Sequence, residues 1–145
     1  MLDTIEQAAE NFCIHQIHEA HTIKDGITEN KKTLIAYIDI NTLEGQKYRV
    51  YIASDEKFMQ KVAKLFLEED ESDEETLKDM TLETANLIIG NAKVIAQESQ
   101  NDNTYTIGTP IFEKIGSFDF QVDNSKTIIL DNNELTVAIK ELDVK

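Results

Sequence analysis

Residues 79–93 read DMTLETANLIIGNAK, and the spacing of polar and apolar side chains in this run is typical of a helix that is buried on one side. At about 100° per residue, Asp79, Glu83, Asn86 and Gly90 share a stripe about 60° wide. A separate apolar stripe lies more than about 100° around the axis and comprises Leu82, Ala85, Ile89, Ala92 and Ala96. The run therefore predicts a long helix with its apolar side in the core and its polar side free for solvent or a partner.

The sequence before this run predicts one helix, a pair of strands and a second helix. Residues Asp3–His18 are amphipathic, as in a helix that packs on a core. Strands are expected at Thr33–Ile40, where apolar residues alternate, and at Lys47–Ala53, with a turn between them. Ser54 is the expected N-cap of a helix over Asp55–Leu67. The inward side of that helix is expected to contain Val62, Leu65 and Phe66.

A charged segment precedes the long helix, and strands follow it. The run Glu68–Glu75 is too charged to be buried and is interpreted as an exposed connection into a helix over Glu75–Glu98. Turns are expected at residues 123–125 and 131–133. The strands around them are expected at Tyr105–Phe112, Phe118–Val122, Thr127–Leu130 and Leu135–Leu142.

The order of these elements predicts the fold class. A helix, two strands, two helices and then a series of strands indicate an α+β fold, in which a largely antiparallel β-sheet packs against long α-helices. The length of 145 residues is about that of one domain. The whole chain, residues 1–145, is therefore expected to form a single domain.

The composition argues against several classes of function. A net charge of −14 disfavours nucleic-acid binding, which needs clustered Lys and Arg, and binding to anionic membranes. No apolar run is long enough to cross a membrane, and the first residues lack the basic and apolar segments of an export signal. Cys13 is the one cysteine, so no internal disulfide can form. A cytoplasmic protein is therefore expected.

The polar stripe also has an ordinary structural explanation. Glu83 and Asn86 lie three residues apart, so their side chains project from adjacent turns on the same side. A solvated helix face has the same pattern, and pairs at this spacing arise by chance in a chain rich in both residues. Gly90 weakens a helix by about 1 kcal/mol relative to Ala. It either lets another protein approach the helix closely or makes room for a neighbouring element of the same domain.

The segment resembles the signature of the CheC/CheX/FliY family of chemotaxis phosphatases. That signature is an Asp or Ser, a Glu four residues later, an Asn three residues after it, and a Pro some two dozen residues downstream. The matching positions here are Asp79, Glu83, Asn86 and Pro110, the one proline in the chain. CheC members carry the motif twice and CheX members once, so the single copy resembles CheX.

The resemblance implies a function and a role for each residue. It implies a phosphatase that hydrolyses the phosphoaspartate of a CheY-like response regulator. The amide of Asn86 then orients the attacking water, and Glu83 pairs with a lysine of the regulator. Asp79, Gly90 and Pro110 are assigned to partner contact or support. The chain itself is expected to bind no cofactor and no metal, because Mg²⁺ is supplied in the partner's receiver site. A homodimer is also expected from the family.

Two other hypotheses remain open. The same fold can serve as a non-catalytic adaptor that binds a response regulator or a flagellar switch component through the polar stripe. A carboxylate metal-binding protein is the third hypothesis. A metal site is also suggested separately by His15, His18 and His21, which lie close to Cys13 in the sequence. Three residues spaced by three spread over about 120° of a helix, which is a poor arrangement for one metal ion. Ordinary surface histidines are therefore favoured.

Overall fold

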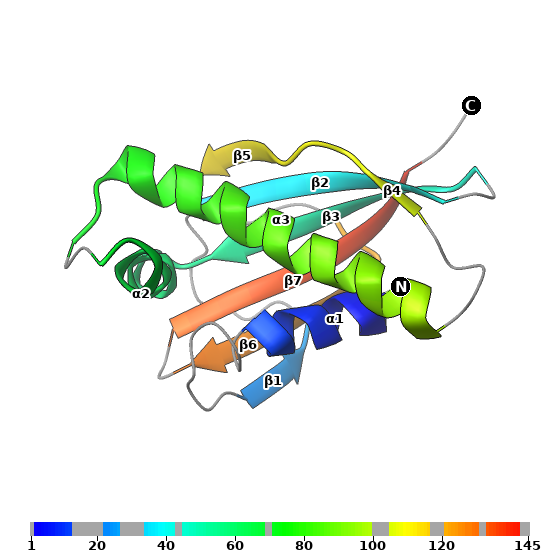
Figure 1. Ribbon diagram of the computed structural model, residues 1–145, viewed down its shortest axis with the longest axis horizontal. Helices are drawn as coiled ribbons and strands as arrows, with labels where there is room; N and C mark the ends of the chain where they lie inside the picture. Colours follow the sequence, from blue (N-terminus) through cyan, green and yellow to red (C-terminus); the bar gives the residue numbers. More distant parts are fainter. Residues whose placement is uncertain are drawn as a thin grey trace.

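The computed structural model describes residues 2–12, 22–26, 34–42, 45–68, 71–99, 105–116, 121–130 and 133–142. Figure 1 shows α1 and α3 lying across the sheet, with α2 near the start of α3. None of the helices in these ranges is long and apolar enough to cross a membrane. The elements, in chain order, are α1 (Leu2–Asn11), β1 (Thr22–Asp25), β2 (Leu34–Thr42), β3 (Lys47–Ser54), α2 (Glu56–Leu67), α3 (Glu74–Ser99), β4 (Tyr105–Ile107), β5 (Ile111–Ile115), β6 (Asn124–Leu130) and β7 (Asn133–Leu142).

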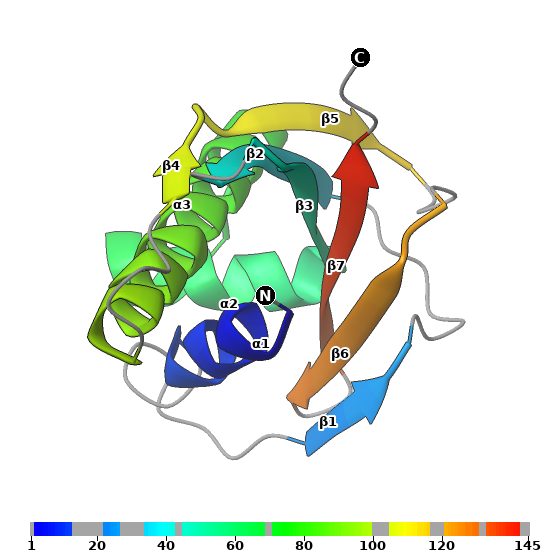
Figure 2. The ribbon, with the colours of Figure 1, turned by 90° about the vertical axis from the view of Figure 1, so that its right-hand side faces the viewer.

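The described strands form one sheet, in which each pairing is antiparallel. Its order is β1-β6-β7-β3-β2-β4, and β5 also pairs with β2. Because β3 occupies one edge of β2, both β4 and β5 lie along the other edge. β4 pairs with Ile40–Thr42 and β5 with Leu34–Tyr37. Figure 2 shows the sheet curving around the helices.

The helices cover the concave side of the sheet, and the main core lies between the two layers (Figure 2). Alternate strand residues point into it, so Ile38 and Ile40 of β2 are fully buried there. From the helices, Ile5 of α1, Phe58 of α2 and Ile88 of α3 enter the same cluster. The predicted α+β class, with a largely antiparallel sheet and long helices, is confirmed.

The N-cap of α2 is Asp55 rather than the predicted Ser54. The Asp55 carboxylate accepts a hydrogen bond from the backbone N–H of Phe58 at 2.7 Å and another from the backbone N–H of Glu134 at 2.7 Å. Ser54 ends β3, and its hydroxyl donates to the Asp55 carbonyl at 2.7 Å. The bond to Glu134, in β7, favours Asp55 as the cap, and a local sequence pattern does not reveal it.

One predicted core residue of α2 is exposed. Val62 is fully buried and Phe66 packs against the core, but Leu65 is 46% exposed. The centre of the buried face lies about 90° around the helix from Leu65. That face consists of Phe58, Met59, Val62 and Ala63.

The sequence predicted that the acidic connection between α2 and α3 is exposed throughout, but one of its residues is buried. Ser72 is buried, because the side-chain amide of Gln60 donates to its carbonyl and accepts from its N–H, both at 2.9 Å. Asp73 then accepts from the backbone N–H of Thr76 at 2.8 Å, and α3 begins at Glu74. The side chain of Gln60 thus forms the hydrogen bonds that the backbone of Ser72 needs when it is buried. The charged composition of the segment predicts instead that water forms them.

The strand predicted over Tyr105–Phe112 is two strands, β4 and β5, with Gly108 to Pro110 between them. The backbone comes very close to β2 at this break. The Gly108 N–H donates to the Asp39 carbonyl at 2.8 Å, and a Cβ at Gly108 would lie 3.2 Å from the same oxygen. Pro110 has no N–H to pair with β2, which ends the ladder here.

Some predictions fail or fall outside the described ranges. Asn124 and Ser125 belong to β6 rather than to a turn, and β1 was not predicted. Of the strand predicted at Phe118–Val122, residues 121 and 122 are described, and neither is in a strand. Residues 13–21, with Cys13 and the three histidines, lie outside the described residues.

Candidate functional site

Contacts with neighbouring elements fix the rotation of α3 about its axis. The Thr84 hydroxyl donates to the sulfur of Met59 in α2 at 3.7 Å, and the side-chain amide of Asn11 in α1 donates to the side-chain oxygen Oδ1 of Asn91 at 3.1 Å. Within the predicted apolar stripe, Leu82 is half-buried. The fully or almost fully buried apolar side chains of α3 are Leu77, Met80, Ala85, Ile88, Ile89 and Ala92.

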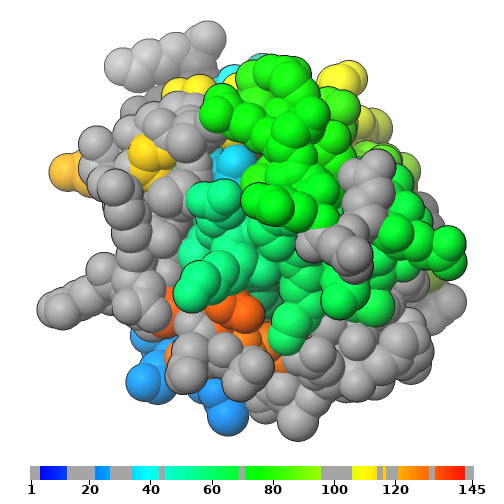
Figure 3. All heavy atoms as spheres, turned by 90° about the vertical axis from the view of Figure 1, so that its left-hand side faces the viewer, coloured from blue at the N-terminus to red at the C-terminus, as the bar shows by residue number. Residues whose placement is uncertain are grey.

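This rotation places the polar stripe on the outside. Asp79, Glu83 and Asn86 are all exposed, and Gly90 is half-exposed. Glu83 and Asn86 project from adjacent turns, so both are accessible to one partner. Figure 3 views the molecule from the end at which α3 begins, where the start of this helix stands out above α2. The structure thus brings three of the predicted site residues and Gly90 onto one accessible helix face.

Two apolar side chains that the sequence analysis did not select lie on the same face. Leu87 is 37% exposed and Val94 is 46% exposed. At 100° per residue they lie within about 40° of Glu83 around the axis. Leu87 belongs to the apolar run Leu87-Ile88-Ile89, in which Ile88 and Ile89 are fully buried. Hydropathy does not distinguish these three residues, but the angle around the helix axis does, and it is the signal that could have identified Leu87.

Gly90 does not make room for another part of the described structure. A Cβ built on Gly90 meets no atom within 4 Å. Within the described part of the chain, no neighbouring strand or helix therefore requires a glycine at this position. Gly90 leaves a gap on the outer face of α3, between Leu87 and Val94.

Pro110 lies in the segment that runs beside the first turns of α3. Phe112, two residues later, is half-buried, and the Lys78 ammonium lies 5.4 Å from the centroid of its ring. Lys78 is followed directly by Asp79, so this contact ties the segment that contains Pro110 to the start of the polar stripe. Pro110 itself is half-exposed.

The outer face of α3 offers an amide and carboxylates without a nucleophile or a metal site. Among the described residues, no group of three or more His, Cys, Asp or Glu side chains is placed to hold a metal ion. The Asn86 amide can donate and accept hydrogen bonds at once, and the Glu83 carboxylate accepts them or pairs with a cation. Such groups position water and charged partners.

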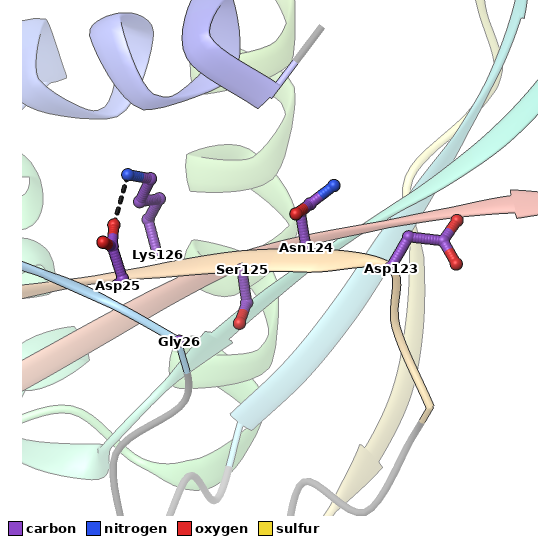
Figure 4. Close-up of a pocket in the computed structure, with 6 residues that line it drawn as sticks. All are labelled: Asp25, Gly26, Asp123, Asn124, Ser125 and Lys126. Carbon is purple, nitrogen blue, oxygen red and sulfur yellow. Dashed lines mark hydrogen bonds and ion pairs between the residues drawn. The ribbon is translucent and has the colours of Figure 1, made fainter.

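A hollow near β1, at the edge of the sheet opposite to β4 and β5, lacks the features of a reactive site. It lies between the end of β1 and the start of β6, and Figure 4 shows its lining. Its cation, Lys126, forms ion pairs with Asp25 and, at 3.8 Å, with Glu6. The lining residues are Asp25, Gly26, Asp123, Asn124, Ser125 and Lys126.

A polar cluster on the other side of the sheet has a structural role. The Arg49 guanidinium donates to both carboxylate oxygens of Asp39, at 2.8 and 3.0 Å, and lies 4.0 Å from the ring centroid of Tyr37. The hydrogen bond with Asp39 raises the pKa of Arg49 above its ordinary value. Burial raises the pKa of the neighbouring Tyr51 phenol. Arg49 and Asp39 face each other across β3 and β2, so the pair strengthens that pairing.

Comparisons with known proteins agree on one family. The family model described as "Chemotaxis phosphatase CheX" matches residues 40–131. No curated protein sequence matches the chain. Among solved structures, the chemotaxis protein CheX from Vibrio vulnificus is 15% identical, with a TM-score of 0.80, and the match covers 97% of this chain and 98% of that chain.

Two further structures share the fold. One is the CheX–CheY–BeF₃–Mg²⁺ complex from Borrelia burgdorferi, at 18% identity and a TM-score of 0.70, with 96% of this chain and 97% of that chain covered. The other is Thermotoga maritima FliY, at 16% identity and a TM-score of 0.59, with 97% and 85% covered. At identities this low, what these structural matches establish is the fold of the chain.

Proposed function

The chain belongs to the CheX family of chemotaxis phosphatases, and from this we propose that it hydrolyses the phosphoaspartate of a CheY-like response regulator. One observation supports this function above others: Glu83 and Asn86 project together from an exposed helix face. The face holds groups that position water and charge, without a nucleophile of its own. That combination suits a reaction whose other components are supplied by the substrate protein.

In the proposed reaction, the receiver domain supplies the phosphoaspartate, a bound Mg²⁺ and a lysine. A water molecule attacks the phosphorus in line with the bond to the aspartate oxygen. That bond breaks, inorganic phosphate leaves, and the aspartate carboxylate is regenerated. Little covalent chemistry is left for the phosphatase, so its contribution is positioning.

Asn86 and Glu83 divide this positioning between them. The Asn86 amide holds the attacking water, because it offers a donor and an acceptor to the same molecule. A carboxylate at this position would repel the phosphoryl group. Glu83, one turn earlier, pairs with the receiver lysine and sets the register of the two proteins. Asp79 and Pro110 support or contact the partner at the start of the helix.

A non-catalytic adaptor is the competing function. It would use the same exposed stripe to bind a response regulator or a switch component and would leave the phosphoryl group in place. The two functions differ in turnover. Only a phosphatase releases more than one phosphate for each molecule of the chain.

The deciding experiment measures phosphate release from a CheY-like regulator that has been phosphorylated with acetyl phosphate in the presence of Mg²⁺. After removal of acetyl phosphate, a substoichiometric amount of the chain is added. We expect release to accelerate about a hundredfold or more, with multiple turnovers. Binding of the phosphorylated regulator without acceleration would support the adaptor instead. Light scattering of the purified chain would measure its oligomeric state. The homodimer stays a prediction from the family.

Gly90→Ala gives a prediction in which stability and activity change in opposite directions. A Cβ meets nothing within 4 Å, so Ala is expected to stabilise the free chain by about 1 kcal/mol through helix propensity. Thermal unfolding should then shift upward by about 4 °C. If the regulator approaches the helix at this gap, the same methyl group should lower kcat/KM by about tenfold. Unchanged phosphate release with increased stability would remove Gly90 from the contact surface.

A further inference from the structure

The outer face of α3 changes character along its length. Its first part carries the carboxylates Asp79 and Glu83, and its second part carries the exposed side chains of Leu87 and Val94. These two apolar residues are seven positions apart, which is about 10.5 Å along the axis, or two turns. Asn86 lies at the boundary between the acidic part and the apolar part. Exposed large apolar side chains gathered beside a polar site are typical of protein contact surfaces.

The gap at Gly90 gives the apolar part a defined shape. Leu87 and Val94 stand on either side of a position that has no side chain and has open space around it. A partner's side chain or loop can therefore enter between them and contact both. Apolar contacts of this kind contribute affinity when a partner buries them.

From this arrangement we propose that Leu87 and Val94 form an apolar seat for the receiver domain itself, a proposal that rests on the proposed function. A stable protein contact buries about 800 Å² on each partner, a patch roughly 30 Å across. Val94 is about 12 Å along the helix from Asn86. A receiver domain whose phosphorylation site reaches Asn86 therefore covers the seat as well, which leaves no room there for a different protein.

Charge complementarity fixes the orientation of this partner. The acidic part of α3 faces the receiver lysine, which carries positive charge, and the apolar seat faces the surface next to the phosphorylation site. The seat then selects regulators that have exposed apolar side chains beside their phosphorylation site. It adds affinity to that of the Glu83 pair, whereas Asn86 sets the rate of the bound complex. Loss of the seat should consequently raise KM and leave kcat almost unchanged.

The test compares wild type with the double variant Leu87→Ala/Val94→Ala. Alanine is the strongest helix former, so both substitutions keep α3 intact. Binding is measured with a CheY-like regulator loaded with beryllofluoride and Mg²⁺, and turnover with the phosphorylated regulator. We expect binding to weaken about 10- to 30-fold and KM to rise by the same factor, with kcat within about twofold of wild type. The matched control is Leu65→Ala/Leu67→Ala, which removes two apolar side chains of similar exposure, 46% and 45%, from α2.

The outcomes separate this proposal from the proposed function. In one outcome, wild type binds the loaded regulator but does not hydrolyse its phosphoaspartate, and only the α3 variant binds more weakly. That outcome would refute the phosphatase function and support the seat. Hydrolysis by wild type with unchanged KM in the α3 variant would refute the seat alone. Equal weakening in both variants would also refute it, because the effect would then not be specific to α3. Wild type that neither binds nor hydrolyses any CheY-like regulator tested would overturn both.

Discussion

Replacing Asn86 with Ala is expected to reduce the acceleration of phosphate release by about a hundredfold, with little change in binding of the regulator. Asn86 is exposed on α3, so the substitution disturbs no core packing, and Ala favours the helix. The loss would come from the attacking water, which would no longer be held in line with the bond that breaks. Single-turnover release of phosphate from the phosphorylated regulator measures this step directly.

Two further variants identify the chemistry at position 86. Asn86→Asp keeps the shape but replaces an N–H donor with a negative charge, so it should be at least as inactive as Asn86→Ala. Asn91→Ala is the control on the same helix, because the Asn91 side chain bonds Asn11 within the domain. It should lower stability by about 1 kcal/mol and leave kcat unchanged. Full activity of Asn86→Ala would show that water is positioned by another group or by the regulator alone.

The types of the main elements could be predicted because their patterns are local. α3 has apolar and polar residues on separate stripes, and β2 alternates into the core at Ile38 and Ile40. The short strand β1 could not be predicted, because its residues are half-buried or exposed and show no alternation of apolar side chains. It is held by pairing with β6, more than a hundred residues away in sequence.

Contacts between distant segments account for the other errors. Asp55 rather than Ser54 caps α2 because its carboxylate also binds the N–H of Glu134. Ser72 is buried in an acidic connection because the Gln60 amide satisfies its backbone. In both cases a side chain satisfies backbone groups of a segment to which no periodicity connects it. Local propensity and charge are therefore poor guides at such positions.

The candidate site could be predicted only in part for the same reason. Periodicity alone places Asp79, Glu83 and Asn86 on one face, and the structure has all three exposed. The same angular count also puts Leu87 on this face, but its apolar side chain argues for burial, and the structure has it 37% exposed. Periodicity does not place the segment after Pro110 beside the start of α3, a position that the contact between Lys78 and Phe112 shows. The structure therefore contributes the exposure of the apolar side chains and the contact at Phe112, whereas their angular positions on the helix follow from the sequence.

Reversal of charge at Glu83 should weaken the interaction with the regulator by about a hundredfold. Glu83→Lys places an ammonium group opposite the receiver lysine, and like charges in a protein contact cost several kcal/mol. The effect should fall mainly on KM, because Glu83 sets the register and does not hold the attacking water. Glu83→Gln, which removes the charge without reversing it, should raise KM by about tenfold.

A matched control variant and a change of salt concentration distinguish the pair between Glu83 and the receiver lysine from an effect of the overall charge of the chain. With a net charge of −14, any loss of an acidic residue alters long-range attraction or repulsion toward the regulator. Glu141→Lys makes the same change of charge at an exposed position on β7, away from α3, and should leave KM within about twofold. Raising the ionic strength should narrow the difference between wild type and Glu83→Gln, because salt screens the pair that the variant lacks. Equal effects of the two lysine variants would attribute the loss to net charge and would remove Glu83 from the contact with the receiver lysine.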